Sequence, residues 1–174
     1  MFNRTRITIP SLVRIKAGAL DRLGLYLSRE KFQRVAMFTS SGLDPTLPER
    51  ATSGFAGKRV ELQRHIEVRN AGFEHAVEYF EQLPGSCQAL IGLGGGKALD
   101  VAKYVAYLAK KPYFAVPTSL SNDGFCSPQS SLTLGGRRRS LPSTMPYAVV
   151  VDTAVCLGAP DPLWWSGVAI WSAK

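Results

Sequence analysis

The sequence is poor in the residues that build disulfide frameworks and metal sites. It has three cysteines, Cys87, Cys126 and Cys156, and two histidines, His65 and His75. Three widely spaced cysteines make neither a disulfide framework nor a zinc site, so we expect buried or half-buried thiols in a reducing compartment. Two lone, separated histidines do not build a zinc site either. We expect His75 on a helix surface, and His65 in a strand, facing solvent or a neighbour.

Long apolar runs and targeting signals are also missing. No apolar run reaches the ~18 residues that a membrane-spanning helix needs, and residues 1–30 contain no signal-peptide core. The composition, with 45% hydrophobic and 20% charged residues, excludes disordered and low-complexity classes. The length of 174 residues corresponds to one domain. We therefore expect a cytoplasmic globular protein without a membrane partner.

Acidic residues are scarce relative to basic ones. The chain has 21 Lys and Arg against 13 Asp and Glu, a formal charge of +8, and most of the excess lies in residues 1–70. Such an excess attracts anions, and the candidates are nucleic acid, phosphorylated small molecules and a missing acidic partner segment. Residues 137–139 are three arginines, but no nucleic-acid-binding motif accompanies them. A short charge run is usually a solvated loop, so we expect no nucleic acid as partner, and the other two candidates stay open.

Short apolar strands alternate with amphipathic helices along the chain. The spacing predicts strands over residues 6–9, 12–15, 34–39, 59–68, 88–93, 113–116 and 147–151. It predicts helices over residues 17–27, 71–83 and 97–109, and a loop with an irregular helix over residues 40–58. Residues 135–140 are expected in a hairpin turn or an exposed loop. This alternation predicts an α/β fold, a Rossmann-like parallel sheet sandwiched by helices.

The sharpest local signal is a run of three glycines between a buried strand and a helix, at residues 94–96. Glycines let backbone N–H groups approach an anion closely, and the N-terminus of the following helix adds positive potential. The pattern is neither G-x-G-x-x-G nor a P-loop, and a simple tight connection is the alternative. We expect Asp100 in the first turn of the helix and Lys103 on its solvated face.

A second signal is the polar segment P-T-S-L-S-N-D-G-F-C-S-P at residues 117–128, which follows the next buried strand. Ligands of open parallel sheets bind at the carboxyl ends of the strands, so both segments are expected at one edge. Several hydroxyls and a carboxylate can hydrogen-bond a cofactor or a polyol. A polar turn with Asx capping is the alternative.

In this order, the two segments resemble the iron-containing alcohol dehydrogenase and dehydroquinate synthase superfamily, and more closely its sn-glycerol-1-phosphate dehydrogenases. G-G-G-K-A-L-D-V-A-K-Y is similar to the nucleotide turn GGG-x-x-x-D-x-A-K, and residues 117–128 are similar to PTS-x-S-x-DG-x-x-SP. The resemblance covers residues 7–168. It implies the N-terminal nucleotide-binding domain of a two-domain enzyme. That enzyme would reduce dihydroxyacetone phosphate to sn-glycerol 1-phosphate with NAD or NADP, aided by zinc.

The resemblance also implies site residues. Those assigned to the cofactor are Gly94, Gly95, Gly96, Lys97, Asp100, Thr118, Ser119, Ser121 and Ser127. Asp123 is assigned to the substrate. Residues 39–41, T-S-S, follow the second long strand and lack the acidic side chain that would hold a ribose 2′-OH. Both NAD and NADP therefore stay open.

The metal ligands that the resemblance implies, one aspartate and two histidines, are missing. Ile170 stands where the aspartate of a G-x-G-D segment is expected, and an aliphatic side chain cannot bind zinc. We expect residues 169–174 to be a frameshifted tail, since loss of one nucleotide would convert Gly-Val-Gly-Asp-Leu-Val-Ser-Lys into Gly-Val-Ala-Ile-Trp-Ser-Ala-Lys. A deliberate domain fragment and a natural single-domain protein are the alternatives. The coding DNA beyond codon 168 decides between them.

On this interpretation, residues 1–168 are a cofactor-binding domain whose helical metal-binding partner domain is absent, with no catalytic residue of its own. We expect little or no turnover by the chain alone. A glycerol dehydrogenase-like or dehydroquinate synthase-like activity, or a non-enzymatic nucleotide-binding module, is the alternative. Exposure of Leu163, Trp164 and Trp165 would favour poor solubility or homo-oligomerisation.

Overall fold

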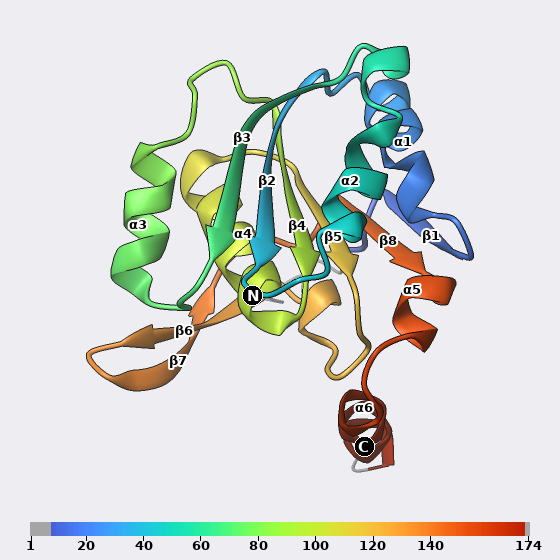
Figure 1. The fold of residues 1–174 in the computed structure, drawn as a ribbon. Helices are drawn as coiled ribbons and strands as arrows, with labels where there is room; N and C mark the ends of the chain where they lie inside the picture. Colours follow the sequence, from blue (N-terminus) through green and yellow to red (C-terminus); the bar gives the residue numbers. More distant parts are fainter. Residues whose placement is uncertain (1–7, 173–174) are drawn as a thin grey trace, which may run out of the picture.

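The chain folds into a six-stranded parallel sheet with helices on both faces (Figure 1). This computed structural model describes residues 8–172, with backbone only for residues 170 and 171. The strands of the sheet are β1 (Leu12–Lys16), β2 (Arg34–Ser40), β3 (Glu61–Val68), β4 (Ala89–Gly94), β5 (Tyr113–Pro117) and β8 (Ala148–Asp152). A separate antiparallel hairpin consists of β6 (Gln129–Leu134) and β7 (Arg137–Pro142).

The strands lie in the order β1-β8-β5-β4-β2-β3, and every neighbouring pair is parallel. From β2 onward this is a common doubly wound order, in which the chain first steps one way and then reverses. The reversal falls between β2 and β4, where Thr39 pairs with Leu93 near the carboxyl ends of both strands. Doubly wound sheets bind their ligands at this point.

Helices cover the two faces of the sheet, except for the last helix of the chain, which lies beyond the carboxyl ends of the strands (Figure 1). The helices are α1 (Leu23–Arg29), α2 (Thr46–Ser53), α3 (Phe73–Glu81), α4 (Gly96–Ala109), α5 (Thr153–Leu157) and α6 (Asp161–Ser172), with short 3-10 turns η1 (Leu20–Arg22), η2 (Ala56–Lys58) and η3 (Gly124–Cys126). Successive strand residues point to opposite faces. Met37 of β2 therefore packs in the core under α1 and α2, while Phe38 packs in the core under α3 and α4. The predicted α/β sandwich is confirmed.

The predicted elements agree with the structure to within two residues for the strands of the sheet from residue 12 onward and for α3 and α4. The helix predicted over 17–27 starts later, with η1 and then α1, after Gly18 adopts a left-handed φ of +71°. Within residues 40–58 the structure has α2 and η2, which confirms the irregular helical region. Of the strand predicted over 6–9, residues 6–7 lie outside the described residues, and residues 8–9 are irregular.

The hairpin corrects one prediction in part. Gly135 and Gly136 form the predicted turn with φ values of +57° and +75°, but the three arginines that follow belong to strand β7. Two hydrophobic side chains anchor the hairpin: Leu132 is fully buried in the core under α3 and α4, and Leu141 packs against that core while partly buried. In Figure 1 the hairpin projects beside the lower end of α3.

One buried carboxylate ties the first strand to the last. Asp152, at the end of β8, caps α5 by accepting a hydrogen bond from the Ala154 amide at 3.1 Å. It also accepts from the amides of Gly18 at 3.2 Å and Leu20 at 3.0 Å, just after β1. Because β1 pairs with β8 over Leu12–Lys16, this carboxylate fixes the edge of the sheet.

Candidate nucleotide-binding site

The glycine turn, Gly94–Gly96, lies where the strand order reverses. Gly94 has a φ of +140°, and a Cβ there would overlap the Ser40 hydroxyl at the end of β2. The Gly95 amide donates to Ser40 Oγ at 3.0 Å. A Cβ on Gly96 would lie 3.0 Å from Asn122 Nδ2. The turn therefore needs glycine at position 94, and at position 96 a side chain would have to displace Asn122.

The site loop, residues 117–128, packs against this turn. The Thr118 amide donates to the Gly94 carbonyl at 3.1 Å. Ser119 is 7% exposed, and its hydroxyl lies 3.4 Å from that of Ser121. Asn122 Oδ1 accepts from the Gly124 amide at 2.9 Å, which is an Asx turn. The structure thus contains the capped turn that the sequence offered as an alternative, at the same edge as the glycines.

A cavity of about 490 Å³, called here the site cavity, lies between the N-terminus of α4, the site loop and the hairpin. The predicted site residues that line it are Gly96, Lys97, Asp100, Asp123 and Ser127. The remaining predicted residues, Gly94, Gly95, Thr118, Ser119 and Ser121, lie at the same sheet edge but outside the lining of this cavity. The structure therefore brings half of the predicted set into one cavity.

Six residues that the sequence analysis did not assign to the site complete the lining. They are Asn122, Gly124, Gln129, Ser131, Arg138 and Ser140. Four of the six come from the hairpin, which was not predicted as a pair of strands. The hairpin turn predicted at residues 135–140 was the signal that could have found them, because strands flank such a turn.

Two predictions about α4 are wrong. Lys103 is not solvated: its side chain is 0% exposed, its Nζ lies 3.3 Å from Asp100 Oδ1, and it donates to the Gly124 carbonyl at 2.6 Å. Asp100 is not in the first turn, because the helix begins at Gly96. Lys103 is buried because η3, which begins at Gly124, packs against α4 and accepts its hydrogen bond.

The buried Asp100–Lys103 pair ties α4 to the site loop. Burial raises the pKa of Asp100 and lowers the pKa of Lys103, and in each case the partner's charge opposes the shift. Through Gly124, Lys103 fixes the loop segment that carries Asp123 and Ser127. We conclude that Lys103, which does not line the cavity itself, positions the lining residues through its contacts with Asp100 and Gly124.

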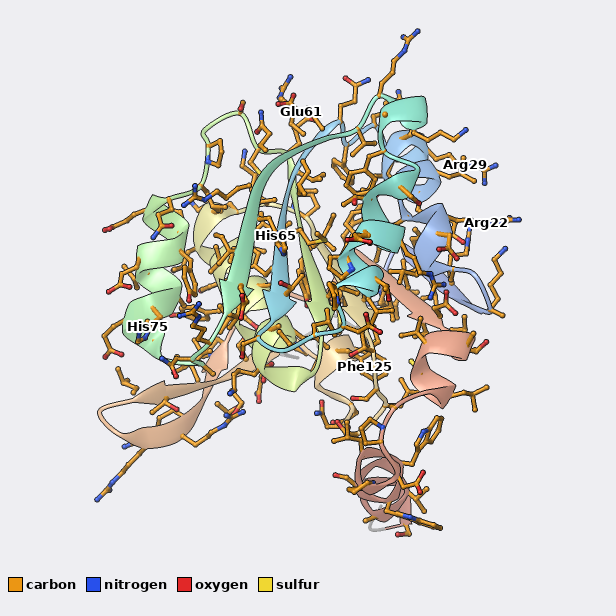
Figure 2. All side chains as sticks on the ribbon, in the orientation of Figure 1. Arg22, Arg29, Glu61, His65, His75 and Phe125 are labelled. Carbon is orange, nitrogen blue, oxygen red and sulfur yellow. The ribbon has the colours of Figure 1, made fainter. Side chains whose placement is uncertain are left out.

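The histidines lie as expected and far from one another (Figure 2). His65 is exposed on β3, with Nε2 2.9 Å from Thr39 Oγ1, and His75 is half-buried on α3. Among residues 8–172, no three His, Cys, Asp or Glu side chains lie together as a metal ion would require. The described residues do not fit the zinc centre that the resemblance implies.

The cysteines differ from the prediction at one position. Cys87 and Cys156 are buried, and burial raises the pKa of the Cys156 thiol to about 11. Cys126 is exposed, because it lies in the short η3 turn of the site loop rather than under the sheet. All three thiols are free.

The last described helix, α6, packs its small residues on the site loop. Ser166 Oγ donates to the Ser121 carbonyl at 3.2 Å, and a Cβ on Gly167 would overlap the Leu120 carbonyl. Trp165 is 71% exposed and Leu163 38%, as expected, whereas Trp164 is half-buried. Helix α6 continues across residue 168, and the origin of residues 169–174 stays a prediction.

Within residues 8–172, no helix has the length and apolarity to cross a bilayer.

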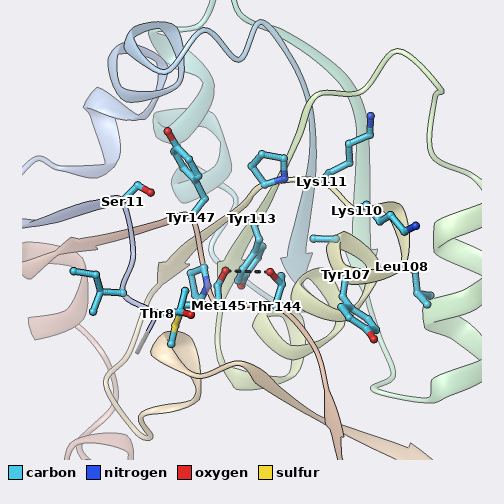
Figure 3. A pocket seen from close by; sticks show the side chains of 14 residues that line it. Thr8, Ser11, Tyr107, Leu108, Lys110, Lys111, Tyr113, Thr144, Met145 and Tyr147 are labelled. Carbon is cyan, nitrogen blue, oxygen red and sulfur yellow. Dashed lines mark hydrogen bonds between the residues drawn. The ribbon is translucent and has the colours of Figure 1, made fainter. Parts of the chain in front are cut away.

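A larger cavity of about 710 Å³, the amino-edge cavity, lies at the opposite edge of the sheet (Figure 3). Its lining includes Lys111 and Tyr113 at the start of β5 and Tyr147 just before β8. A dashed line in Figure 3 marks the hydrogen bond from Thr144 Oγ1 to the Met145 carbonyl, at 3.2 Å. None of the described lining residues is acidic, and no sequence-predicted site residue is among them.

A doubly wound parallel sheet, with a glycine turn and a polar loop where the strand order reverses, defines an α/β domain of the nucleotide-binding type. Residues 14–160 match the family described as iron-containing alcohol dehydrogenase. This chain belongs to that family of dehydrogenases, as the two segments implied.

The curated relatives agree with this membership, and a solved structure shares the fold. A protein of Thermofilum pendens, named a glycerol-1-phosphate dehydrogenase acting with NAD(P)+, is 34% identical over 94% of this chain and 47% of its own. A protein of the same name from Hyperthermus butylicus is 33% identical over 97% of this chain and 49% of its own. The crystal structure of glycerol dehydrogenase from Schizosaccharomyces pombe superimposes with a TM-score of 0.85 and 23% identity, over 95% of this chain and 43% of that one. The chain spans about half the length of the curated relatives it matches.

Proposed function

We propose that the chain binds NAD or NADP at the site cavity, as the cofactor-binding part of a dehydrogenase that reduces dihydroxyacetone phosphate to sn-glycerol 1-phosphate. One observation carries the proposal: the N-terminus of α4 and the polar side chains of the site loop line one cavity, and α4 begins at the glycine turn, where the strand order reverses. The relatives named glycerol-1-phosphate dehydrogenase support the substrate.

The N-terminus of α4 is the proposed pyrophosphate contact. First-turn amides of a helix have no carbonyl partner within the helix, and the positive end of the helix dipole favours an anion. The Gly95 amide already donates to Ser40, so the contact falls to Gly96 and Lys97. The bound cofactor supplies the hydride, and the chain's own residues bind and orient it.

The site loop is the proposed substrate side. Asp123 and Ser127 line the cavity together with Gly96. A carboxylate accepts hydrogen bonds from the hydroxyl of a polyol phosphate, and a serine hydroxyl can donate to or accept from the cofactor. Lys103 keeps both residues in place through its bond to Gly124.

The end of β2 supports the use of both dinucleotides. Thr39 and Ser40 carry hydroxyls where a ribose-binding carboxylate would otherwise stand. The Thr39 hydroxyl is hydrogen-bonded to His65 Nε2, and the Ser40 hydroxyl accepts a hydrogen bond from the Gly95 amide. No acidic side chain at residues 39–41 would repel the 2′-phosphate of NADP, so we propose that NADPH binds as well as NADH.

We also propose that the 174 residues alone turn over dihydroxyacetone phosphate slowly or not at all. The support is Ile170, which stands at the position of the implied metal-binding aspartate. On this proposal the isolated chain is a cofactor-binding module. The alternative, a glycerol dehydrogenase-like activity, is tested by replacing dihydroxyacetone phosphate with dihydroxyacetone in the assay. Turnover of dihydroxyacetone by the chain would favour that alternative.

The test is direct titration of the purified chain with NADH and NADPH, followed by nucleotide fluorescence and calorimetry. A dinucleotide at 100 times its Kd should stabilise the fold by about 2.7 kcal/mol, which raises Tm. Asp123→Asn should leave dinucleotide affinity unchanged while weakening sn-glycerol 1-phosphate binding. Absence of binding by both dinucleotides would sink the proposal.

A further inference from the structure

The basic run at residues 137–139 is divided between two faces by strand geometry. Residues 137–139 all belong to β7, where successive side chains point to opposite sides. Arg138 lines the site cavity, and Arg137 and Arg139 do not. The basic run therefore places one guanidinium, that of Arg138, at the proposed cofactor site.

Neighbouring side chains position Arg138. Its Nε donates to Ser131 Oγ at 2.9 Å, across the hairpin. On the same side of the hairpin, Ser140 Oγ donates to Gln129 Oε1 at 2.7 Å. The cavity-facing side of the hairpin is therefore a hydrogen-bonded polar surface, and the guanidinium is anchored at its Nε.

The charges around the cavity favour an anion. Its lining carries two cations, Lys97 and Arg138, and two carboxylates, Asp100 and Asp123. Lys103 pairs with Asp100 from behind the wall at 3.3 Å. With that lysine included, positive charge is in excess by one. Lys97 Nζ lies 3.5 Å from the Arg69 carbonyl. Arg138 is the cation that the hairpin supplies to the lining, and its charge opposes the rise that burial causes in the pKa of Asp100.

We propose that Arg138 binds a phosphate group of the ligand that occupies the site cavity. The guanidinium fork matches the oxygens of a phosphate, and such charge-assisted pairs are stronger than neutral hydrogen bonds. The inference rests on the proposed function, which supplies two sources of that chemistry: a phosphate of the dinucleotide and the phosphate of the triose. The hairpin is then the third wall of the site.

The experiment compares three variants that change the net charge equally. Arg138→Gln should weaken the affected phosphorylated ligand about tenfold or more, as expected for hydrogen bonds to a charged group. Arg137→Gln and Arg139→Gln lie on the other side of the hairpin and should change affinity by about twofold or less, because salt screens distant exposed charges. Arg138→Lys, which keeps the charge but loses the fork, should fall between them.

The probes separate the sources of the phosphate. Calorimetric titrations with pyrophosphate, NADH, NADPH and sn-glycerol 1-phosphate are run on each variant, with glycerol as the phosphate-free control. Loss confined to NADPH assigns the 2′-phosphate, loss of both dinucleotides assigns the pyrophosphate, and loss of sn-glycerol 1-phosphate assigns the triose. Circular dichroism and thermal unfolding verify that each variant folds.

Two failures are distinguishable. If the wild-type chain binds dinucleotide and Arg138→Gln binds every probe as tightly as Arg139→Gln does, the Arg138 contact is wrong and the proposed function stands. If the wild-type chain binds pyrophosphate but neither dinucleotide, and Arg138→Gln weakens pyrophosphate, the contact stands and the proposed function is wrong. If the wild-type chain binds none of the probes, both are overturned.

Discussion

The two edges of the sheet carry cavities of opposite character. The amino-edge cavity is the larger, about 710 Å³ against about 490 Å³, but its described lining is mostly apolar, aromatic and small polar side chains with two lysines. The site cavity is smaller and gathers cations, carboxylates, hydroxyls and a helix N-terminus. Both adjoin β5, one at its start and one beyond its end.

The difference teaches that strand direction, rather than cavity volume, determines where charged and polar side chains gather in this sheet. In parallel sheets the segments that leave the carboxyl ends are free to form loops that hold ligands. Here, Gly94 leaves β4 and Thr118 leaves β5 at that edge, and they are joined by a hydrogen bond of 3.1 Å. The opposite edge receives incoming connections, and its cavity has no comparable polar convergence.

The largest expected effect is from Lys103→Met at the carboxyl edge. It leaves Asp100 buried without its partner and should lower the free energy of unfolding by about 3–5 kcal/mol. The amino-edge control, Lys111→Met, should have little effect. Urea unfolding measures both. The double variant Asp100→Asn, Lys103→Met should recover part of the loss.

Equal losses from Lys103→Met and Lys111→Met would break the comparison between the edges. The readout that separates positioning from stability is sn-glycerol 1-phosphate affinity. It should fall for Lys103→Met even at a temperature where the variant is fully folded, because Gly124 loses its anchor.

A smaller effect is expected at the two ends of β4. Gly94→Ala introduces a Cβ at a φ of +140° against Ser40 and should cost about 1–3 kcal/mol, and weaken NADH binding. Gly85, before the start of β4, has no atom within 4 Å of the position of a Cβ, so Gly85→Ala should be close to neutral. Thermal unfolding and NADH titration measure both variants. A tolerated Gly94→Ala would show that the turn does not need its left-handed glycine.

The smallest effect is expected at Tyr147, in the amino-edge cavity. Its hydroxyl donates to Glu30, and this hydrogen bond, followed by burial and the Glu30 charge, raises the pKa of Tyr147 above the ordinary 10.0. Tyr147→Phe should cost about 1 kcal/mol or less, since the pair is close to solvent, with NADH affinity unchanged.

The pH dependence of Tyr147 has a definite sign. A raised folded-state pKa means that the stabilisation is complete below pH 10 and is lost as the pH rises through the folded-state pKa. The Tm difference between wild type and Tyr147→Phe should therefore shrink between pH 9 and pH 12, whereas a difference that grows with pH would contradict this assignment.

Local pattern was sufficient to predict most of the sheet. Runs such as V-A-M-F and A-V-V-V are buried on both faces, and such runs form central parallel strands. The helical spacing in 97–109 is equally regular. The glycine turn and the site loop followed from their positions after two of these strands.

The hairpin and two charged residues could not be predicted in the same way. Residues 129–134, Q-S-S-L-T-L, are mostly polar, and only Ser130 and Leu132 are buried, so little apolar alternation marks a strand. Lys103 occupies a helical position whose burial depends on Gly124, a residue 21 positions away. The role of Arg138 depends on knowing that residues 137–142 are extended, since only then do neighbouring arginines separate.

The link between β1 and β8 has a consequence for synthesis of the chain. In the described sheet β1 has β8 as its one neighbour, and the Asp152 carboxylate that holds Gly18 lies 134 residues further along the chain. At 5–20 residues per second, the ribosome takes roughly ten seconds to cover that distance. During that interval the first strand emerges without a place to pair. Within the described sheet, β1 can therefore pair only after β8 has been synthesised, so the oldest strand of the domain depends on the youngest.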